Sequence, residues 1–458
     1  MHLRIDKTTI LKHDVAGPRY TSYPAAPAWN EDVTSEVYQE RLKKFGESEK
    51  TLSLYFHLPF CRSLCTFCAC NVIIRQPDEK YGNEYNAYLL KEMAMVSQAI
   101  GKKMTVKQLH WGGGTPTFLT ELQMEKLFLR TEKHFNIDKE GEIAIEIDPR
   151  TISFDKLKCL RQLGFNRISL GVQDFNAKVQ QSVNRIQPFE VVERCTTWVR
   201  QLGFKSINFD LIYGLPHQTT ESFRKTVDLV MTLKPNRIAL YSFAYLPWLK
   251  KHQRKMDLSS LPTRETKLDI FLLARDVFVN NGYQSIAMDH FALADDELAQ
   301  AFNAGKLYRN FMGYTVKPAD EYIGLGVSSI GFFEDAFIQN HKILRDYYET
   351  LDKGQLPVER GKILSQDDRI RQWVIHSFMC HFEINKREFK DKFFVDFDEY
   401  FSSERAHLNR CLEDGLICMK PDQITASGLG KIFIRNVCMG FDAYLPQMQK
   451  TTRFSQTV

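Results

Sequence analysis

The sequence predicts an α/β protein built on a partial (β/α)6 TIM-like barrel, with an N-terminal arm and a C-terminal, mainly helical domain. Three observations predict this fold. Six β-rich apolar runs alternate with helical patterns, each run ends in small or polar residues, and the pattern changes to helices after about residue 365. Strand–helix units in series indicate a parallel sheet. We expect an arm at 1–48, a barrel with its extension at 49–364, and a capping domain at 365–458.

The six runs have the composition of buried parallel strands. They are rich in β-branched and aromatic residues and nearly continuous in apolar character, as expected where helices cover both faces of a sheet. Apolar residues between the runs recur at steps of three and four, which is the spacing of one helix face. The runs begin at Leu52, Val106, Ile143, Arg167, Ser206 and Arg237. The helical residues are Leu89, Met93, Val96 and Ile100, and then Phe223, Val227 and Val230.

Small or polar groups follow every run. In a barrel the carboxyl ends of all strands open on one face, and that face carries the site. We therefore expect a barrel with one ring-shaped site rather than a doubly wound sheet. The strand ends lead in order to the cysteines at 61–70, residues 112–115, Glu146 with Asp148, Gln173 with Asp174, Asp210, and Ser242 with Ala244.

Composition excludes several classes of protein. Lys and Arg number 61 against 56 Asp and Glu, and the resulting net charge of +5 permits a locally basic pocket but predicts no nucleic-acid partner. No apolar stretch reaches the length of about 18 residues that a membrane span needs. The charged N-terminus does not resemble an export signal. We expect a cytoplasmic monomer without a membrane partner.

The ten cysteines are unevenly distributed, with four between Cys61 and Cys70. A disulfide framework is not expected in a chain of this size and kind. The other six are expected to be small buried apolar residues. These are Cys159, Cys195, Cys380, Cys411, Cys418 and Cys438.

Cys61, Cys65, Cys68 and Cys70 have the spacing C-x-x-x-C-x-x-C-x-C directly after a strand. Iron–sulfur clusters are usually held by four thiolates. Three close cysteines with no fourth at ligand spacing elsewhere indicate a cluster with one open iron, which can chelate a substrate as the open position of a catalytic zinc does. A structural zinc site with Cys70 as fourth ligand is the alternative, although Cys68 and Cys70 are awkwardly close for it.

The C-x-x-x-C-x-x-C spacing resembles the signature of the radical S-adenosylmethionine superfamily. The resemblance implies that Cys61, Cys65 and Cys68 bind a 4Fe-4S cluster whose fourth iron is chelated by S-adenosylmethionine. It also implies an electron donor of the flavodoxin or ferredoxin type, which reduces the cluster so that S-adenosylmethionine is cleaved to a 5′-deoxyadenosyl radical. The partial barrel is that superfamily's fold.

Seven motifs in order are similar to the family of oxygen-independent coproporphyrinogen III oxidases. The resemblance implies that two propionate side chains of coproporphyrinogen III lose carbon dioxide and become the vinyl groups of protoporphyrinogen IX. The motifs are PRYTSYP (18–24), FHLPFCRSLCTFCACN (56–71), HWGGGTPT (110–117), GVQDF (171–175), NFDLIYGLP (208–216), MDHFA (288–292) and RNVCMGFDAYL (435–445).

Cys70 favours the oxidase, because the related haem chaperone lacks this cysteine. An anaerobic haem-degrading or haem-trafficking relative stays the alternative. One departure is Ala69, where the oxidases usually have glycine. The replacement would strain the loop if the position needs a positive φ.

The resemblance also implies two molecules of S-adenosylmethionine near the cluster. A tight turn at the three glycines and a helix N-cap at Glu146 or Asp148 are the plain alternatives. The assignment of Ala244 and Ile330 as contacts depends wholly on the resemblance, since the sequence alone indicates core packing for both. The implied contacts are Tyr55, Phe67, Gly113, Gly114, Thr115, Glu146, Gln173, Arg185, Asp210, Ala244 and Ile330.

The substrate's four carboxylates call for basic side chains in the pocket. The candidates are Arg19 and Arg309, each of which is equally well explained as a solvated surface arginine. Cys70 is expected to hold substrate or cofactor geometry rather than iron.

The C-terminal region also has the helix and strand–turn–strand order of a winged helix, which would suit a DNA-binding regulator. DNA binding needs concentrated basic residues. Nearby acidic residues offset the basic ones, so a domain that caps the barrel mouth is the better interpretation. The basic residues are Arg405, Arg410 and Lys420, and the acidic ones are Glu404, Glu413 and Asp414.

Overall fold

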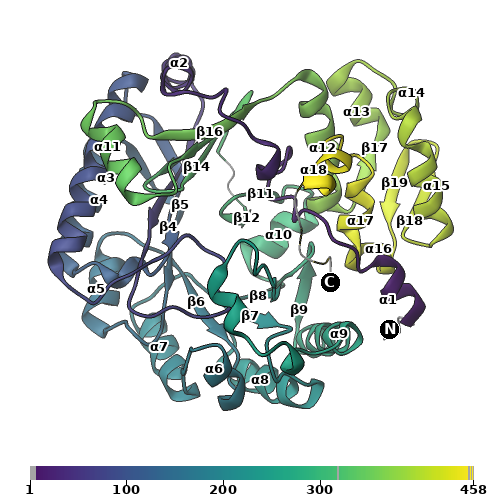
Figure 1. Cartoon of the computed structure of the whole chain (residues 1–458), viewed down its shortest axis with the longest axis horizontal. Helices are drawn as coiled ribbons and strands as arrows, with labels where there is room; N and C mark the ends of the chain where they lie inside the picture. The colour runs from purple at the N-terminus through teal and green to yellow at the C-terminus, as the bar shows by residue number, and fades with distance from the viewer. Residues whose placement is uncertain (1–6, 317–318, 452–453, 455, 457–458) are drawn as a thin grey trace.

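The computed structural model describes residues 7–316, 319–451, 454 and 456. The six predicted strands lie next to one another and parallel in one curved sheet, with helices on its outer side (Figure 1). The prediction of a partial parallel barrel is therefore confirmed. The strands are β1 (Leu52–Leu58), β4 (Thr105–Gly113), β5 (Asn136–Ile147), β6 (Arg167–Gln173), β7 (Ser206–Tyr213) and β8 (Arg237–Ser242).

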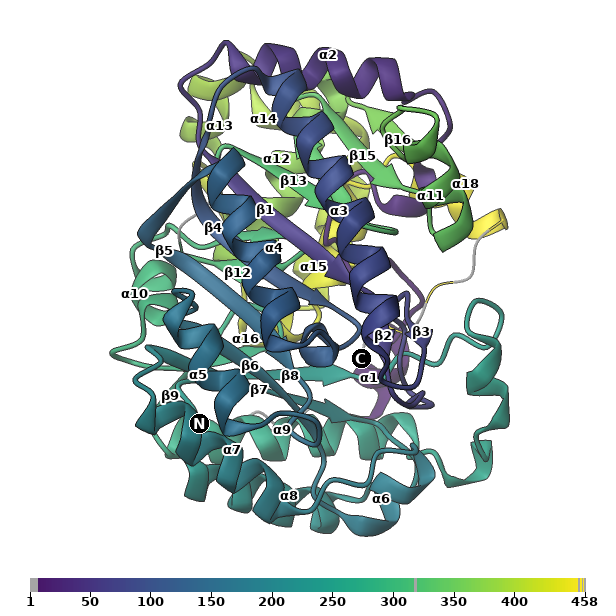
Figure 2. The same ribbon diagram turned by 90° about the vertical axis from the view of Figure 1, so that its left-hand side faces the viewer.

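Helices connect the strands and cover the outside of the barrel, as Figure 2 shows for α3 and α4. Side-chain oxygens of Asp78, Thr120 and Thr219 accept backbone N–H bonds at the starts of α3, α4 and α8, which is the role of an N-cap. All seven apolar residues predicted to face the core are buried. The helices are α3 (Glu79–Ile100), α4 (Glu121–His134), α5 (Phe154–Gln162), α6 (Ala177–Ser182), α7 (Phe189–Gln201) and α8 (Thr220–Leu233).

The sheet continues beyond the six strands on both sides. The strand β13 pairs parallel with β1 and leads to three antiparallel strands, while β10 and β9 pair antiparallel beyond β8. The additional strands are β9 (Tyr283–Ile286), β10 (His290–Leu293), β13 (Glu321–Leu325), β14 (Ile330–Phe333), β15 (Ala336–Asn340) and β16 (Val358–Ile363). Other elements of this region are α9 (Arg264–Asn280), α10 (Glu297–Asn303), α11 (Leu344–Asp352) and the hairpin β11 (Tyr308–Asn310) with β12 (Gly313–Thr315).

The expectation of an irregular arm is wrong for two segments, which form α1 (Lys7–His13) and α2 (Ser35–Gly46). Tyr38, Leu42 and Phe45 are buried along one face of α2, and Thr34 caps its start. The same periodicity and capping rules that identified the barrel helices therefore explain α2. The segment 18–24 contains no helix, as its prolines predicted.

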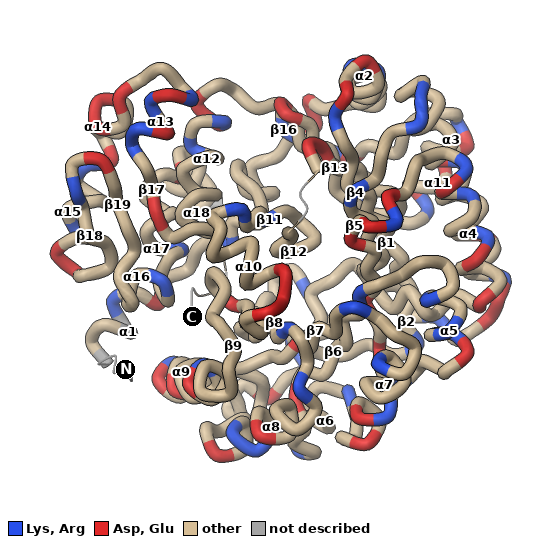
Figure 3. The backbone as a smooth tube through the Cα atoms, turned by 180° about the vertical axis from the view of Figure 1, so that it is seen from behind, with Lys and Arg blue, Asp and Glu red and all other residues tan. Residues whose placement is uncertain are grey.

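The C-terminal region contains the predicted helix, short β-hairpin and further helix, together with one additional strand. Its helices carry both signs of charge along the backbone (Figure 3). The domain boundaries after residues 48 and 364 stay predictions. The elements are α12 (Gln366–His381), β17 (Glu383–Asn385), α13 (Lys386–Phe393), α14 (Phe397–Tyr400), α15 (Arg405–Glu413), β18 (Ile417–Lys420), β19 (Gln423–Ala426), α16 (Gly428–Ile432), α17 (Ile434–Met439) and α18 (Leu445–Thr451).

The arm motif and the C-terminal motif bind each other. The Nε atom of buried Arg435 donates to the carbonyl oxygen of Pro18 at 2.9 Å, and its Nη2 atom donates to that of Gly17. The Tyr20 hydroxyl donates to Asp442 Oδ2 at 3.0 Å. Since an unpaired buried guanidinium is costly, these bonds hold the arm against the C-terminal helices.

The scattered cysteines mostly match the prediction of buried apolar residues, and none of the ten described cysteines forms a disulfide. Cys195, Cys380, Cys411 and Cys438 are buried. The prediction is wrong for Cys418, which lies exposed on the hairpin strand β18. Cys159 is half-buried. Among the described helices, none has both the length and the apolar character needed to cross a membrane.

Candidate functional site

A cavity of about 580 Å³ lies inside the barrel, and its wall contains all four cysteines of the 61–70 loop. The strand ends supply most of the remaining wall, as expected for a barrel site. The predicted site residues that line it are Cys61, Cys65, Phe67, Cys68, Cys70, Gly113, Gly114, Thr115, Glu146, Gln173, Arg185 and Asp210.

The cysteine loop is held in place by hydrogen bonds from two other loops. The backbone N–H of Thr66 donates to the carbonyl oxygen of Val183 at 3.0 Å, and Asn184 Nδ2 donates to that of Leu64 at 2.8 Å. Sγ of Cys61 lies 3.4 Å from the hydroxyl of Thr115. Ala69 has no positive φ, so the expected strain at this position is absent.

The thiols differ in acidity. The neighbouring Cys70 lowers the pKa of Cys68, while burial raises the pKa of Cys61 to about 11. A metal centre favours the thiolate form that it binds. Within the described residues, no three Cys, His, Asp or Glu side chains could hold a single metal ion, so the zinc alternative gains no support. A 4Fe-4S cluster differs in needing its thiolates at separate corners.

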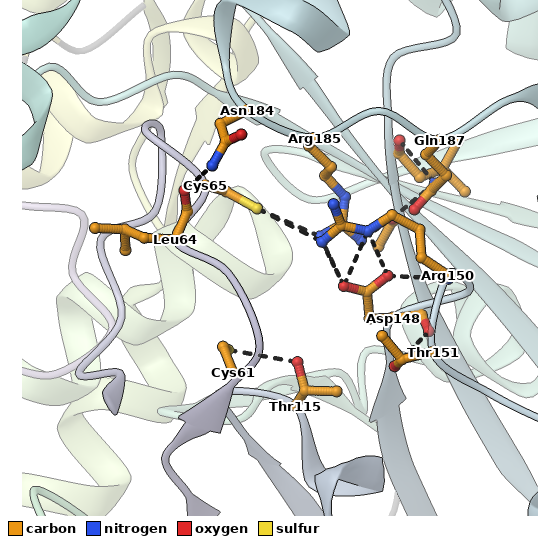
Figure 4. A network of polar contacts seen from close by, with 12 residues as sticks. Cys61, Leu64, Cys65, Thr115, Asp148, Arg150, Thr151, Asn184, Arg185 and Gln187 are labelled. Carbon is orange, nitrogen blue, oxygen red and sulfur yellow. Dashed lines mark hydrogen bonds and ion pairs between the residues drawn. The ribbon is translucent and has the colours of Figure 1, made fainter. Parts of the chain in front are cut away.

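Two arginines converge on the cysteine loop beside one carboxylate (Figure 4). Asp148 Oδ2 accepts from Nη2 of Arg150 at 2.6 Å and from Nη1 of Arg185 at 3.4 Å. The same two nitrogen atoms lie 3.9 and 3.7 Å from Sγ of Cys65. Although burial opposes it, the charges of Arg185 and Arg150 lower the pKa of Asp148. Positive charge is thus concentrated next to a cysteine sulfur.

Glu146 lies inside β5, two residues before Asp148. Its Oε2 atom accepts from the backbone N–H of Gly113 at 3.0 Å, and its Oε1 atom lies 3.3 Å from His110 Nε2. Gly113 has a φ of +111°, and a Cβ atom there would lie 2.5 Å from the His57 ring. This close approach explains a glycine at the position. The N-cap alternative fails for Glu146, since it lies inside β5 and accepts from a neighbouring strand.

Gln173 and Asp210, which also line the cavity, have an unusual backbone conformation and an unusual pKa, respectively. Gln173 has a φ of +67°, and its buried Oε1 atom lacks a hydrogen-bond partner within the described structure. Burial, together with the charge of Glu146, raises the pKa of Asp210 to about 6. An unpaired buried amide oxygen in a cavity wall suits a polar ligand.

Three implied contacts do not line this cavity. Tyr55 stacks on His110 with ring centroids 5.9 Å apart, and its hydroxyl lies 3.1 Å from His57 Nδ1. The carbonyl oxygen of Ala244 accepts from Gln253 Nε2 at 3.2 Å. Ile330 packs against an aromatic cluster that includes Trp29.

The two arginines proposed for the substrate lie close together but outside the cavity of the cysteines. Arg19 Nη2 donates to the carbonyl oxygen of Ser242 at 2.7 Å. Arg309 Nη1 donates to the carbonyl oxygen of Arg19 at 2.9 Å, and its Nε atom is buried with no partner in the described structure. Arg309 lines a second cavity of about 630 Å³ between the arm, β11 and α12. Neither side chain is a freely solvated surface arginine.

Several wall residues were not selected from the sequence. Arg150, Tyr241, His290 and Tyr314 line the cavity, and the His290 ring lies edge-on to both tyrosines. His290 belongs to the MDHFA motif, so this motif could have identified it as a site residue from the sequence. Nothing local places Arg150 beside Cys65, which lies 85 residues away in the sequence.

Comparison with known proteins agrees with this site. The Radical SAM superfamily matches residues 55–230, which include the cysteine loop, the end of β1 and the four strands β4 to β7. The chain is similar to oxygen-independent coproporphyrinogen III oxidases from Synechocystis sp. (43% identity over 98% of this chain and 97% of that one) and from Pseudomonas aeruginosa (41%, over 100% and 99%). It is also similar to the solved structure of the radical SAM coproporphyrinogen III oxidase from Escherichia coli, with a TM-score of 0.91 and 39% identity over 97% of this chain and 100% of that one.

Proposed function

We propose how the residues of this chain, which belongs to the family of oxygen-independent coproporphyrinogen III oxidases, perform that family's reaction. The reaction is the oxidative decarboxylation of two propionate side chains of coproporphyrinogen III to vinyl groups, giving protoporphyrinogen IX. The assignment of roles to residues depends on one observation. The cysteine loop and the ring of strand-end side chains line the same cavity.

In this proposal Cys61, Cys65 and Cys68 hold the 4Fe-4S cluster that the family requires. When bound, the cluster and S-adenosylmethionine would supply the radical chemistry needed to remove a hydrogen atom from the propionate carbon β to the carboxylate. The Thr115 hydroxyl lies 3.4 Å from Sγ of Cys61, and Arg185 Nη1 donates toward Sγ of Cys65 at 3.7 Å. Hydrogen bonds to the sulfurs tune an iron–sulfur cluster. The protein supplies position and protection, while the cofactor supplies reactivity.

The remaining wall residues would bind S-adenosylmethionine. Glu146 and Asp210 can accept from its ammonium group or ribose hydroxyls, Gln173 can accept through its unpaired amide oxygen, and Arg185 can pair with its carboxylate. We extend the proposal to two molecules of S-adenosylmethionine. Tyr55, Ala244 and Ile330 lie outside the cavity wall, and the resemblance alone supports them as contacts.

The substrate side of the proposal involves Cys70, Arg19 and Arg309. Cys70 lies beside Cys68 in the cavity wall, and we assign it to cofactor or substrate geometry rather than to iron. Arg309 has an unpaired buried N–H and can meet a propionate carboxylate, with Arg19 beside it. The electron donor type, the monomeric state and the cytoplasmic location stay predictions.

Anaerobic reconstitution with iron and sulfide tests the function. We expect a brown protein whose EPR spectrum, recorded after reduction, changes when S-adenosylmethionine is added. It should convert coproporphyrinogen III to protoporphyrinogen IX with release of two molecules of carbon dioxide. A reconstituted protein that cleaves S-adenosylmethionine but leaves coproporphyrinogen III intact would contradict the assignment and favour a haem-trafficking or haem-degrading role.

A further inference from the structure

We propose that residues 248–255, together with the outer side of the cysteine loop, form the docking surface for a small acidic electron-transfer protein. This inference rests on the proposed function, because it concerns the delivery of the electron that the cluster needs. We call the segment 248–255 the basic segment; it follows β8 and includes a short 3-10 helix at Lys251–Lys255.

The basic segment is bound directly to the backbone of the cysteine loop. Lys250 Nζ donates to the carbonyl oxygen of Cys70 at 2.9 Å, and His252 Nε2 lies 2.9 Å from that of Cys68. Gln253 Nε2 donates to the carbonyl oxygen of Phe67 at 3.2 Å. These three contacts place the segment against the loop that holds the cysteines, and none of residues 248–255 lines the cavity. A protein docked here is separated from the cluster position by that loop.

The charged side chains of the basic segment are all positive. Residues 248–256 include Lys250, Lys251, Arg254 and Lys255 but no Asp or Glu. The side chains of Lys251, Arg254 and Lys255 are exposed, whereas Lys250 is half-buried against the loop. Arg62, which belongs to the cysteine loop itself, is also exposed. With a net charge of only +5 for the whole chain, four cations within six residues form a local concentration that attracts an acidic surface.

Two large apolar side chains adjoin these cations. Trp248 is 39% exposed and Leu249 is 66% exposed. An apolar centre next to charged residues is the composition of a protein interface, and tryptophan is enriched at such centres. Redox partners form small and weak complexes, in which opposite charges speed encounter more than they strengthen binding.

The electron balance is simple. The docked donor gives up one electron and the oxidised cluster takes it up, so the donor is oxidised by one electron and no proton or group moves. The acidic donor is identified by this charge complementarity and by the need for a one-electron reductant. A reduced flavodoxin is a suitable probe.

The test compares two reductants on the reconstituted holoenzyme. Reduced flavodoxin must dock, whereas dithionite is a small ion that needs no docking surface. We expect the triple variant K251E/R254E/K255E to lose about tenfold or more of its flavodoxin-driven rate of S-adenosylmethionine cleavage, in line with the effect of electrostatic steering. Its dithionite-driven rate should stay at the wild-type value. Salt should slow the flavodoxin-driven reaction of the wild type far more than that of the variant.

A matched control reverses three exposed cations on the outer face of the barrel. K126E/R130E/K133E changes the net charge equally on α4, and it should retain both rates. Equal flavodoxin-driven rates in the wild type and the K251E/R254E/K255E variant would overturn the proposal. So would a loss of that rate in the α4 control as large as in the basic-segment variant.

Two further results distinguish a failure of the docking proposal from loss of the cluster in the variant and from a failure of the proposed function. If K251E/R254E/K255E binds less iron than the wild type, the neutral K251Q/K255Q variant replaces it, with the same expected dependence on the reductant. A wild-type protein that cleaves no S-adenosylmethionine even with dithionite would instead contradict the proposed function, whatever the basic segment does.

Discussion

Nη1 of Arg185 lies 3.7 Å from Sγ of Cys65, and Asp148 holds this guanidinium together with that of Arg150. Hydrogen bonds and positive charge at a ligating sulfur stabilise the reduced form of a cluster. We therefore expect Arg150→Met to lower the midpoint potential of the reconstituted cluster by roughly 60 mV, which is a tenfold change for one electron. A redox titration followed by EPR measures it.

Arg150→Lys is the control for this prediction, since it keeps the charge but loses the planar fork that binds Asp148. It should give a potential between those of the wild type and Arg150→Met. Identical potentials for all three proteins would show that the Arg150 guanidinium does not tune the cluster.

Cys61 and Cys70 should respond differently to removal of the thiol. Cys61→Ala should abolish the 4Fe-4S spectrum, because a ligating thiolate is lost. Cys70→Ser should keep the iron content and the visible absorbance yet lose most decarboxylation, because Cys70 is assigned to geometry. Iron analysis and absorbance spectra distinguish the two, and a Cys70→Ser protein that cannot assemble its cluster would make the assignment wrong.

Arg309 should affect substrate binding more than cofactor chemistry. We expect Arg309→Ala to raise the KM for coproporphyrinogen III by about tenfold or more, the effect of losing one charge-assisted hydrogen bond. The cleavage of S-adenosylmethionine without substrate should be unchanged. Arg19→Ala should have a smaller effect, because its guanidinium already donates to Ser242. An unchanged KM in both variants would show that neither Arg309 nor Arg19 binds the substrate.

Glu92 should make stability depend on pH. Its buried carboxyl accepts from Tyr347, from Asn340 and from the backbone N–H of Gly326, yet burial raises its pKa from 4.5 to about 7. A pKa raised on folding gives stability that is present below pH 4.5 and is lost as the pH rises through 7. This group should therefore lower the free energy of unfolding by up to about 3 kcal/mol between pH 5 and pH 8.

The Glu92→Gln variant tests this sign, since glutamine does not titrate. Chemical unfolding of the apo-protein at both pH values gives the two free energies. Relative to wild type, the variant should become more stable toward pH 8. An equal pH dependence in both proteins would contradict the raised pKa.

Arg435 should stabilise the arm. Arg435→Met leaves the carbonyl groups of Gly17 and Pro18 without a buried donor, at a cost of about 1–3 kcal/mol for each buried polar group left unpaired. We expect a lower Tm and faster proteolysis near residues 17–24. Lys431→Met, in the preceding helix α16, removes a cation that lies over the Phe382 ring and should leave the arm protected.

Sequence alone was sufficient where the determining interactions are local. The six strands follow from residue composition and from the helical spacing between them, and the cysteine loop follows from ligand spacing within ten residues. The rule that parallel strands end at one face then brought Gly113, Glu146, Gln173 and Asp210 to one cavity. The arm helix α2 was also predictable, because Tyr38, Leu42 and Phe45 have ordinary helical spacing.

Only the tertiary structure decided which distant side chains meet. Arg150 faces Cys65, the basic segment lies on the cysteine loop, and Arg435 binds the carbonyl groups of an arm more than 400 residues earlier. Short strands such as β14 and β15 carry too few residues for a clear pattern. These contacts depend on how the whole sheet curves and on which polar groups become buried, and burial is a property of the complete fold rather than of any local run of residues.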